Sequence, residues 1–173
     1  FNFEKNLNYK FLPRPHFTTD NASLIFNKEK ISKINKLKIY ISLESLFSLK
    51  NMKLKDVIIE ESNFNLNKNN YDFFIKLLDS NFTDTNFKIL NSNIFYRNSE
   101  NDVLFINHIT SANYIYDPKK SKNVLNIKNN IFNLAYSIEL FNDEDEKKLN
   151  SKINIDSLSL QLENQFSYEK ELD

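Results

Sequence analysis

The residues that could support acid–base or metal chemistry are few. His16 and His108 are the two histidines. His16 follows Pro13-Arg14-Pro15, a stretch that proline keeps extended, and His108 sits at an alternating position of a predicted strand. Neither has a sequence-near partner that would suggest a metal site. We therefore interpret both as surface or hydrogen-bonded residues.

Motifs for nucleophilic and phosphate chemistry are absent. The chain has no Cys and no Gly, so it lacks a thiol nucleophile, a glycine-containing nucleophile elbow and a glycine-rich phosphate loop. Composition alone does not exclude a Ser-His-Asp triad, because the members of a triad are distant in sequence. An enzyme would need His16 or His108 to converge with carboxylates in a pocket. We predict a non-enzymatic protein with no catalytic residue, no cofactor and no metal.

Two charged runs have alternative interpretations. Asp143-Glu144-Asp145-Glu146 offers oxygen ligands that suit calcium, but no glycine turn accompanies it, and a solvated hairpin tip is favoured. A basic stretch could contact nucleic acid, but the net charge is zero and a solvated strand face is favoured. This stretch comprises Lys28, Lys30, Lys33, Lys36 and Lys38.

The composition indicates a low-GC bacterial genome, since residues with AT-rich codons replace Gly, Ala, Arg and Trp. Without Gly, positions of positive φ must be filled by Asn or Asp, which tolerate this geometry better than other residues. Asn-rich stretches therefore predict turns. The expected turns cover residues 67–70, 98–102, 117–123 and 142–148.

The dominant period of hydrophobicity is two, which is typical of strands. Short, regular spacing predicts a mainly β fold, an elongated and curved antiparallel sheet in which consecutive strands pair. Short helices are predicted at Tyr71–Leu78 and Leu43–Leu49. The chain fits a single β-rich segment over residues 1–173, with strand hairpins continuing over 85–168. Because it opens at Phe1, we expect a fragment of a longer protein.

A weak internal repeat relates two stretches 30 residues apart. Val57–Leu66 reads VIIEESNFNL and Phe87–Tyr96 reads FKILNSNIFY, and Lys128–Phe132 contains a similar step. The repeat predicts either two hairpin corners that share a codon bias or a repeated sheet unit extending in one direction.

Several predicted strands are apolar on one face and rich in Asn, Ser or Lys on the other. A single sheet of this kind needs a cover for its apolar face, which a helix, a second sheet or an apolar ligand can provide. Helix candidates are few and short. We therefore expect part of the apolar face to stay open, or to need the rest of the parent protein.

The order of elements over residues 11–78 resembles the AsmA family of bacterial envelope proteins. The resemblance rests on FLPRPHF at 11–17, KLKIYISLESLFSLK at 36–50, MKLKDVIIE at 52–60 and NFNLNK at 63–68. The family usually has a Gly in the turn after its Leu-x-x-Leu element, where this chain has Leu49-Lys50-Asn51.

The resemblance implies a periplasmic protein, anchored in the inner membrane by a helix outside this chain. It also implies an apolar groove for phospholipid acyl chains, used in phospholipid transfer between the inner and outer membranes and in outer-membrane biogenesis. No lipid-binding residue follows from it. The alternative is a β-rich binding or scaffold module, of surface or adhesion type, with a fully covered core. The two hypotheses differ in whether an apolar face stays accessible.

Overall fold

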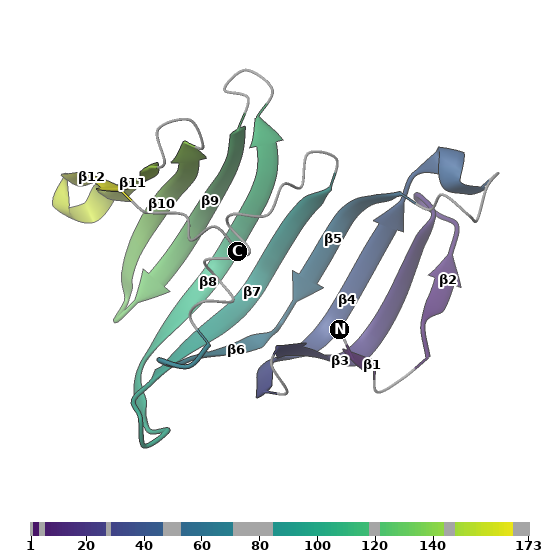
Figure 1. Ribbon diagram of the computed structural model, residues 1–173, viewed down its shortest axis with the longest axis horizontal. Coiled ribbons are helices and arrows are strands. Elements are labelled where there is room, and N and C mark those ends of the chain that lie inside the picture. The colour runs from purple at the N-terminus through teal and green to yellow at the C-terminus, as the bar shows by residue number, and fades with distance from the viewer. Residues whose placement is uncertain are drawn as a thin grey trace.

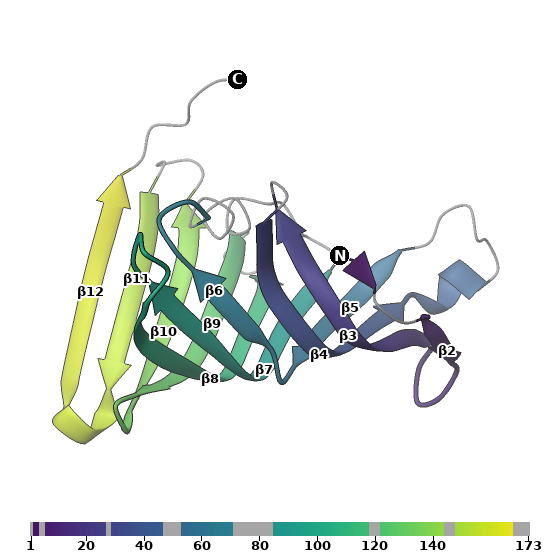
Figure 2. The same ribbon diagram turned by 90° about the horizontal axis from the view of Figure 1, so that it is seen from below.

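The computed structural model describes residues 2–3, 6–26, 29–46, 53–70, 85–117, 122–143 and 148–167. These residues form one large sheet, drawn in Figures 1 and 2 as a single curved and twisted layer. The strands are β1 (Asn2–Phe3), β2 (Asn8–Lys10), β3 (His16–Phe26), β4 (Glu29–Ile41), β5 (Leu54–Glu60), β6 (Asn63–Leu66), β7 (Asn86–Arg97), β8 (Val103–Asp117), β9 (Lys122–Ile131), β10 (Leu134–Asp143), β11 (Lys148–Ile155) and β12 (Leu160–Ser167). The predicted mainly β fold is confirmed.

Strand order follows chain order from β3 to β12, and most neighbours are antiparallel. The exception lies in the middle of the sheet, where β5 and β6 both pair with β7 in parallel. The expectation that all consecutive strands pair as antiparallel neighbours is therefore wrong at this place. Periodicity reveals a strand but not its direction, so the alternating pattern alone could not have shown the exception.

The parallel pair explains the internal repeat. Val57 pairs with Phe87 and Leu66 with Tyr96, so the two repeat copies lie side by side at a constant offset of 30 residues. Neither copy is a hairpin corner. The repeat is a sheet unit that pairs with its own copy.

A transverse line of irregular positions crosses the sheet, which we call the bend row. Asn21, Glu61 and Asn91 have φ values of 59°, 54° and 46°, and the strand registers align them with one another. Asn91 in turn lies between the residues that pair Leu90 with Ser111 and Ser92 with Ile109. A residue in the left-handed conformation interrupts the regular pleat of its strand. The bend row consists of Asn21, Asn35, Glu61, Asn91 and Thr110.

Side-chain alternation shifts by one residue at the bend row. Ile59 and Ser62 are both buried although they are three positions apart, and so are Ile34 and Leu37. The same spacing separates Ala112 from Ile109. The shift keeps the same face inward on both sides of the bend, so the core continues across it. This core contains Ala22, Ile34, Leu37, Val57, Ile59 and Phe64.

Asn fills only some positions of positive φ. Asn21, Asn91, Asn101 and Asn133 fit the expectation. Glu61, Phe132 and Ser159 also have positive φ, so the prediction that Asn or Asp must occupy such positions is incomplete. Phe132 and Asn133 form the two-residue turn between β9 and β10, a geometry that needs positive φ at both residues.

The predicted helices are reduced to one short turn among the described residues. Leu43–Leu46 forms a 3₁₀ turn, η1, where a helix over Leu43–Leu49 was expected. The helix predicted at Tyr71–Leu78 lies outside the described residues. A second 3₁₀ turn, η3 (Asp156–Leu158), joins β11 to β12. Two of the expected turns are found: 67–70, closed by the Asn70 N–H donating to the Asn67 carbonyl at 3.3 Å, and 98–102, closed by the Asn98 N–H donating to the Asp102 carbonyl at 3.1 Å.

Candidate functional site

The two histidines lie on different strands and have structural partners. On β3, His16 is buried, its Nδ1 lies 2.7 Å from the Arg14 carbonyl oxygen, and its ring stacks on Tyr40 with centroids 4.8 Å apart. The Arg14 guanidinium also lies over the Tyr40 ring, 4.5 Å from its centroid, and pairs with Asp56 at 3.0 Å. This cluster holds the chain before β3 against β4 and β5.

His108 is exposed on β8, where Nδ1 lies 3.0 Å from Asn93 Oδ1. The structure thus does not bring the two histidines together. Within the described part of the chain, no group of three or more metal-ligating side chains is present. In that same part, no helix has the length and hydrophobicity needed to cross a membrane.

Two lysines of the basic stretch form ion pairs with carboxylates. Lys36 pairs with Glu61, and Lys38 Nζ lies 2.9 Å from Glu60 Oε1. The Glu61 carboxylate raises the pKa of Lys36. These contacts agree with a solvated strand face. In the acidic run Asp143–Glu146, residues 144–146 lie outside the described residues.

The apolar face of the sheet is continuous over most of its width. Strand registers place one apolar residue from each of β4, β5 and β7 to β12 in a single transverse line, the first apolar row. A second apolar row runs beside it, from Ile39 to Leu140. The first row contains Leu37, Ile59, Ile89, Ala112, Ile127, Ile138, Ile153 and Leu162. The second contains Ile39, Val57, Phe87, Tyr114, Leu125 and Leu140.

Burial decreases along the first apolar row. Leu37 is fully buried and Ala112 is 4% exposed, but Ile138 and Ile153 are only half-buried and Leu162 is 45% exposed. The part of the face formed by β9 to β12 therefore stays accessible. This is the open apolar surface that the sequence predicted.

Four polar side chains interrupt the apolar face, on the adjacent strands β7, β8, β9 and β10. Tyr136 faces Asn129 across the β9–β10 pair. Asn107 and Asn129 are 3% and 5% exposed, and the amides of both bond to the phenolic oxygen of Tyr136. Asn107 also bonds to Tyr96. We call this group the Tyr–Asn cluster; it consists of Tyr96, Asn107, Asn129 and Tyr136.

Burial raises the pKa of both tyrosines in the cluster. For Tyr96, removal from water is the largest cause, and the nearby Tyr136 adds to it, whereas the bond from Asn107 partly offsets it. For Tyr136, removal from water is again the largest cause. Both hydroxyls are therefore neutral over the physiological range.

Sequence reasoning missed the Tyr–Asn cluster. Its signal is the phase of the alternation, since Asn107 occupies an inward position between Phe105 and Ile109, and Asn129 one between Ile127 and Ile131. In a sequence so rich in Asn, these two residues stood out only by their phase. A polar residue in the apolar phase of a strand must find a partner or leave a buried polar atom unpaired.

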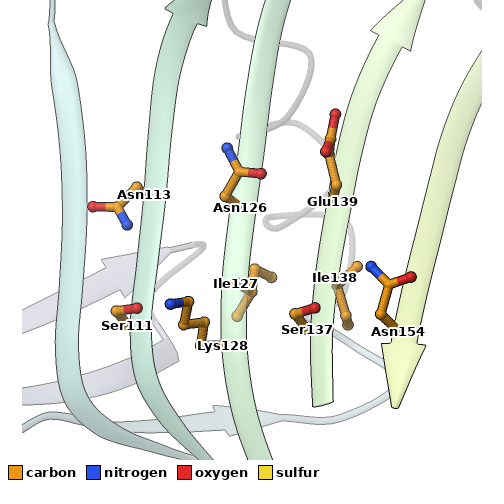
Figure 3. Close-up of a pocket in the computed structure, with 9 residues that line it drawn as sticks. All are labelled: Ser111, Asn113, Asn126, Ile127, Lys128, Ser137, Ile138, Glu139 and Asn154. Carbon is orange, nitrogen blue, oxygen red and sulfur yellow. The ribbon is translucent and has the colours of Figure 1, made fainter. Parts of the chain in front are cut away.

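A shallow concavity of about 230 Å³ lies mainly on the opposite, polar face (Figure 3). Polar side chains from β8 to β11 surround it, and two residues of the first apolar row, Ile127 and Ile138, complete the lining. Lys128 and Glu139 are its charged members. The other lining residues are Ser111, Asn113, Asn126, Ser137 and Asn154.

A scan against protein-family models finds no match to this sequence, and a search of curated proteins finds none either. The similarity to the AsmA family therefore stays a prediction.

Proposed function

We propose that this chain is a non-enzymatic segment of an envelope protein, and that the open part of its apolar face binds the acyl chains of phospholipids. The observation that carries this proposal is the first apolar row. It runs without interruption from the covered core at Leu37 to the accessible strand β12.

Acyl chains suit this surface for a simple energetic reason. Each buried methylene group contributes about 0.8 kcal/mol, and the accessible part of the row offers an apolar contact at each strand from β9 to β12. A chain can then move across the strands without leaving an apolar environment. This property requires a face rather than a catalytic residue.

The resemblance of residues 11–78 to AsmA supplies the biological setting of the proposal. In that setting the segment lies in the periplasm, and an inner-membrane anchor lies outside this chain. The rest of the parent protein continues the groove, and phospholipids move between the inner and outer membranes.

The test compares two neighbouring residues of β11 that point to opposite faces. Ile153→Lys places a charge in the first apolar row, whereas Asn154→Lys places the same charge on the polar face. We expect the wild-type chain to retain radiolabelled phospholipid after incubation with phosphatidylglycerol–phosphatidylethanolamine vesicles and their removal. Ile153→Lys should retain at least tenfold less phospholipid than the wild type, because a buried, unpaired charge is costly. If both variants retained equal amounts of phospholipid, or if the wild type retained none, the proposal would be wrong.

The second candidate is a binding module that uses the polar concavity, which its Asn- and Ser-rich lining favours. Such a module would bind a small polar molecule through hydrogen bonds. In that case Asn154→Lys would abolish binding and Ile153→Lys would not. The same pair of variants therefore separates the two candidates.

A further inference from the structure

Two turns at one end of the sheet expose large apolar side chains. In the β9–β10 turn, Phe132 is 83% exposed, and in the η3 turn between β11 and β12, Leu158 is 60% exposed. Because η3 contacts β10, the two turns lie side by side at the same end of the sheet (Figure 2). We call these two turns, residues 132–133 and 156–159, the apolar rim.

Phe132 occupies a position where an aromatic side chain lowers stability. Its φ of 50° is left-handed, a conformation that suits Asn or Gly much better than Phe. Asn is abundant in this sequence and fills other positions of positive φ. Burial does not offset the cost, because the ring is exposed. An exposed ring kept at a strained position therefore indicates a contact outside the chain.

The same strands have charged residues at their other end. β8 ends and β9 begins within Asp117–Lys122, which reads DPKKSK, and β10 ends and β11 begins within Asp143–Lys148, which reads DEDEKK. Antiparallel pairing places these strand ends opposite the apolar rim. The two turns of the rim read FN and DSLS, in which Asp156 is the one charged residue. The apolar character is therefore specific to one end of the sheet.

The apolar rim adjoins the open part of the apolar face. Leu160 is exposed two residues after Leu158, and Leu162 of the first apolar row follows after two more. On the neighbouring strands, Ile131 and Leu134 pair with each other on either side of the β9–β10 turn. Apolar side chains thus continue from the first apolar row to the tips of the turns.

A phospholipid bilayer fits these projecting turns better than a protein partner does. A stable protein interface needs complementary packing around each side chain, whereas a side chain that projects from a turn enters a fluid acyl region without a matching pocket. The sequence of the rim has one acidic and no basic residue. Attraction to anionic head groups therefore contributes nothing, and the contact depends on the apolar side chains.

We infer that the apolar rim inserts into the surface of a phospholipid bilayer, with Phe132 and Leu158 entering the acyl region. Acyl chains pass from the bilayer onto the apolar face beside Leu160. This inference rests on the proposed function, to which it adds the place where the lipid enters.

The first experiment uses the absence of Trp from the sequence, since one introduced Trp then reports only its own surroundings. Phe132→Trp is compared with Phe11→Trp, because Phe11 is also exposed and lies before β3, away from the rim. With phosphatidylcholine vesicles, the emission of Phe132→Trp should shift to the blue, and lipids brominated in their acyl chains should quench it. Phe11→Trp should not respond. No response in Phe132→Trp, or an equal response in both variants, would show that the inference is wrong.

The second experiment measures how much the rim contributes to binding. Phe132→Asn and Leu158→Asn should each weaken co-sedimentation with phosphatidylcholine vesicles about tenfold, because each removes one large apolar side chain from the bilayer. Phe11→Asn is the matched control and should bind like the wild type. Phe132→Asn also relieves the left-handed strain, so urea unfolding should show a stability no lower than that of the wild type. Unchanged binding in both rim variants, or an equal loss in Phe11→Asn, would contradict the inference.

Ile153→Lys separates the inference from the proposed function. A variant that combines Phe132→Trp with Ile153→Lys should lose phospholipid retention and keep the blue shift, because docking uses the rim and retention uses the face. If the wild type retains phospholipid but Phe132→Trp does not respond to vesicles, the inference is wrong and the proposed function stands. If Phe132→Trp responds but the wild type retains no phospholipid, docking is supported and the proposed function is wrong.

Discussion

Ser62, in the break between β5 and β6, lies beside Ser92 of β7, 30 residues further along the chain, and the Ser62 backbone N–H donates to the Ser92 Oγ at 3.0 Å. Both residues are fully buried. The Asn93 N–H donates to the Ser62 carbonyl at 2.8 Å on the other side of the same junction. The Ser92 hydroxyl thus replaces a backbone acceptor at the point where the bend row interrupts the ladder.

This relationship predicts an asymmetric effect of two alanine substitutions. Ser92→Ala leaves the buried Ser62 N–H without its acceptor and should lower the free energy of unfolding by about 1–3 kcal/mol. Ser62→Ala removes only a hydroxyl that donates to the Glu60 carbonyl at 3.2 Å, and should cost less. Urea denaturation measures both, and an equal loss in the two variants would contradict the assigned roles.

The ion pair of Arg14 with Asp56 should contribute more than that of Lys36 with Glu61. Asp56 is only 7% exposed and accepts a second bond from Asn86 at 3.0 Å. Arg14→Ala therefore leaves a nearly buried carboxylate without its cation, and we expect a loss of about 2–3 kcal/mol.

Lys36→Ala is the matched control, because both members of its pair are about half-exposed. Such a pair contributes at most about 1 kcal/mol. Thermal or urea unfolding of the two variants at the same pH compares them. A larger effect for Lys36→Ala would show that the Arg14 cluster is not structural.

Substitutions in the turn between β9 and β10 should increase the stability of the protein. Phe132 has a φ of 50° and is 83% exposed, so it bears the strain of left-handed geometry without burying its ring. Replacing Phe132-Asn133 by Asn-Gly, the pair preferred in this turn, should stabilise the protein by about 1–2 kcal/mol. The midpoint of urea unfolding should rise, and a fall would mean that the Phe132 ring has a role in the fold.

Alkaline pH should destabilise the fold through the Tyr–Asn cluster. The pKa values of Tyr96 and Tyr136 are raised in the folded state, so the unfolded chain releases these protons first, at its ordinary pKa of about 10. Their contribution is fully present below that pH and declines as the pH rises through the folded pKa values. A double Tyr96→Phe, Tyr136→Phe variant should show a shallower alkaline loss in the free energy of unfolding.

Tyr9→Phe serves as the control for this experiment, because Tyr9 is 48% exposed on the short strand β2. Its alkaline profile should follow that of the wild type. An unchanged profile in the double variant would mean that these two tyrosines do not govern the pH dependence.

Local pattern was sufficient to predict the strands and their inward faces, because alternation along residues such as Leu37 and Ile39 depends only on neighbouring positions. The direction of pairing was not accessible in this way, and the parallel contact of β5 and β6 with β7 was missed. Asn91-Ser92-Asn93 resembles a turn in composition. It lies within β7 because the neighbouring segment pairs with it: the Asn93 N–H donates to the Ser62 carbonyl, and the Ser92 hydroxyl accepts from the Ser62 N–H.

For the candidate site, the sequence predicted an apolar face but not the residues that form it. One-sided strands indicated an apolar face, but the strands that remain open depend on long-range packing. The Tyr–Asn cluster needs four strands in one register before its members meet. No spacing within a single strand contains that information.

The parallel contact between β5–β6 and β7 also has a kinetic consequence. Each half of the sheet, β3 to β6 and β7 to β12, is built largely from neighbours in the chain, whereas this junction joins strands separated by residues 67–85. Contacts that close longer loops form later, so we expect two preassembled halves to dock along this junction in the last step of folding. Amide hydrogens of β7 that bond to β5 and β6 should accordingly exchange in a sub-global opening that leaves the β8–β9 amides protected.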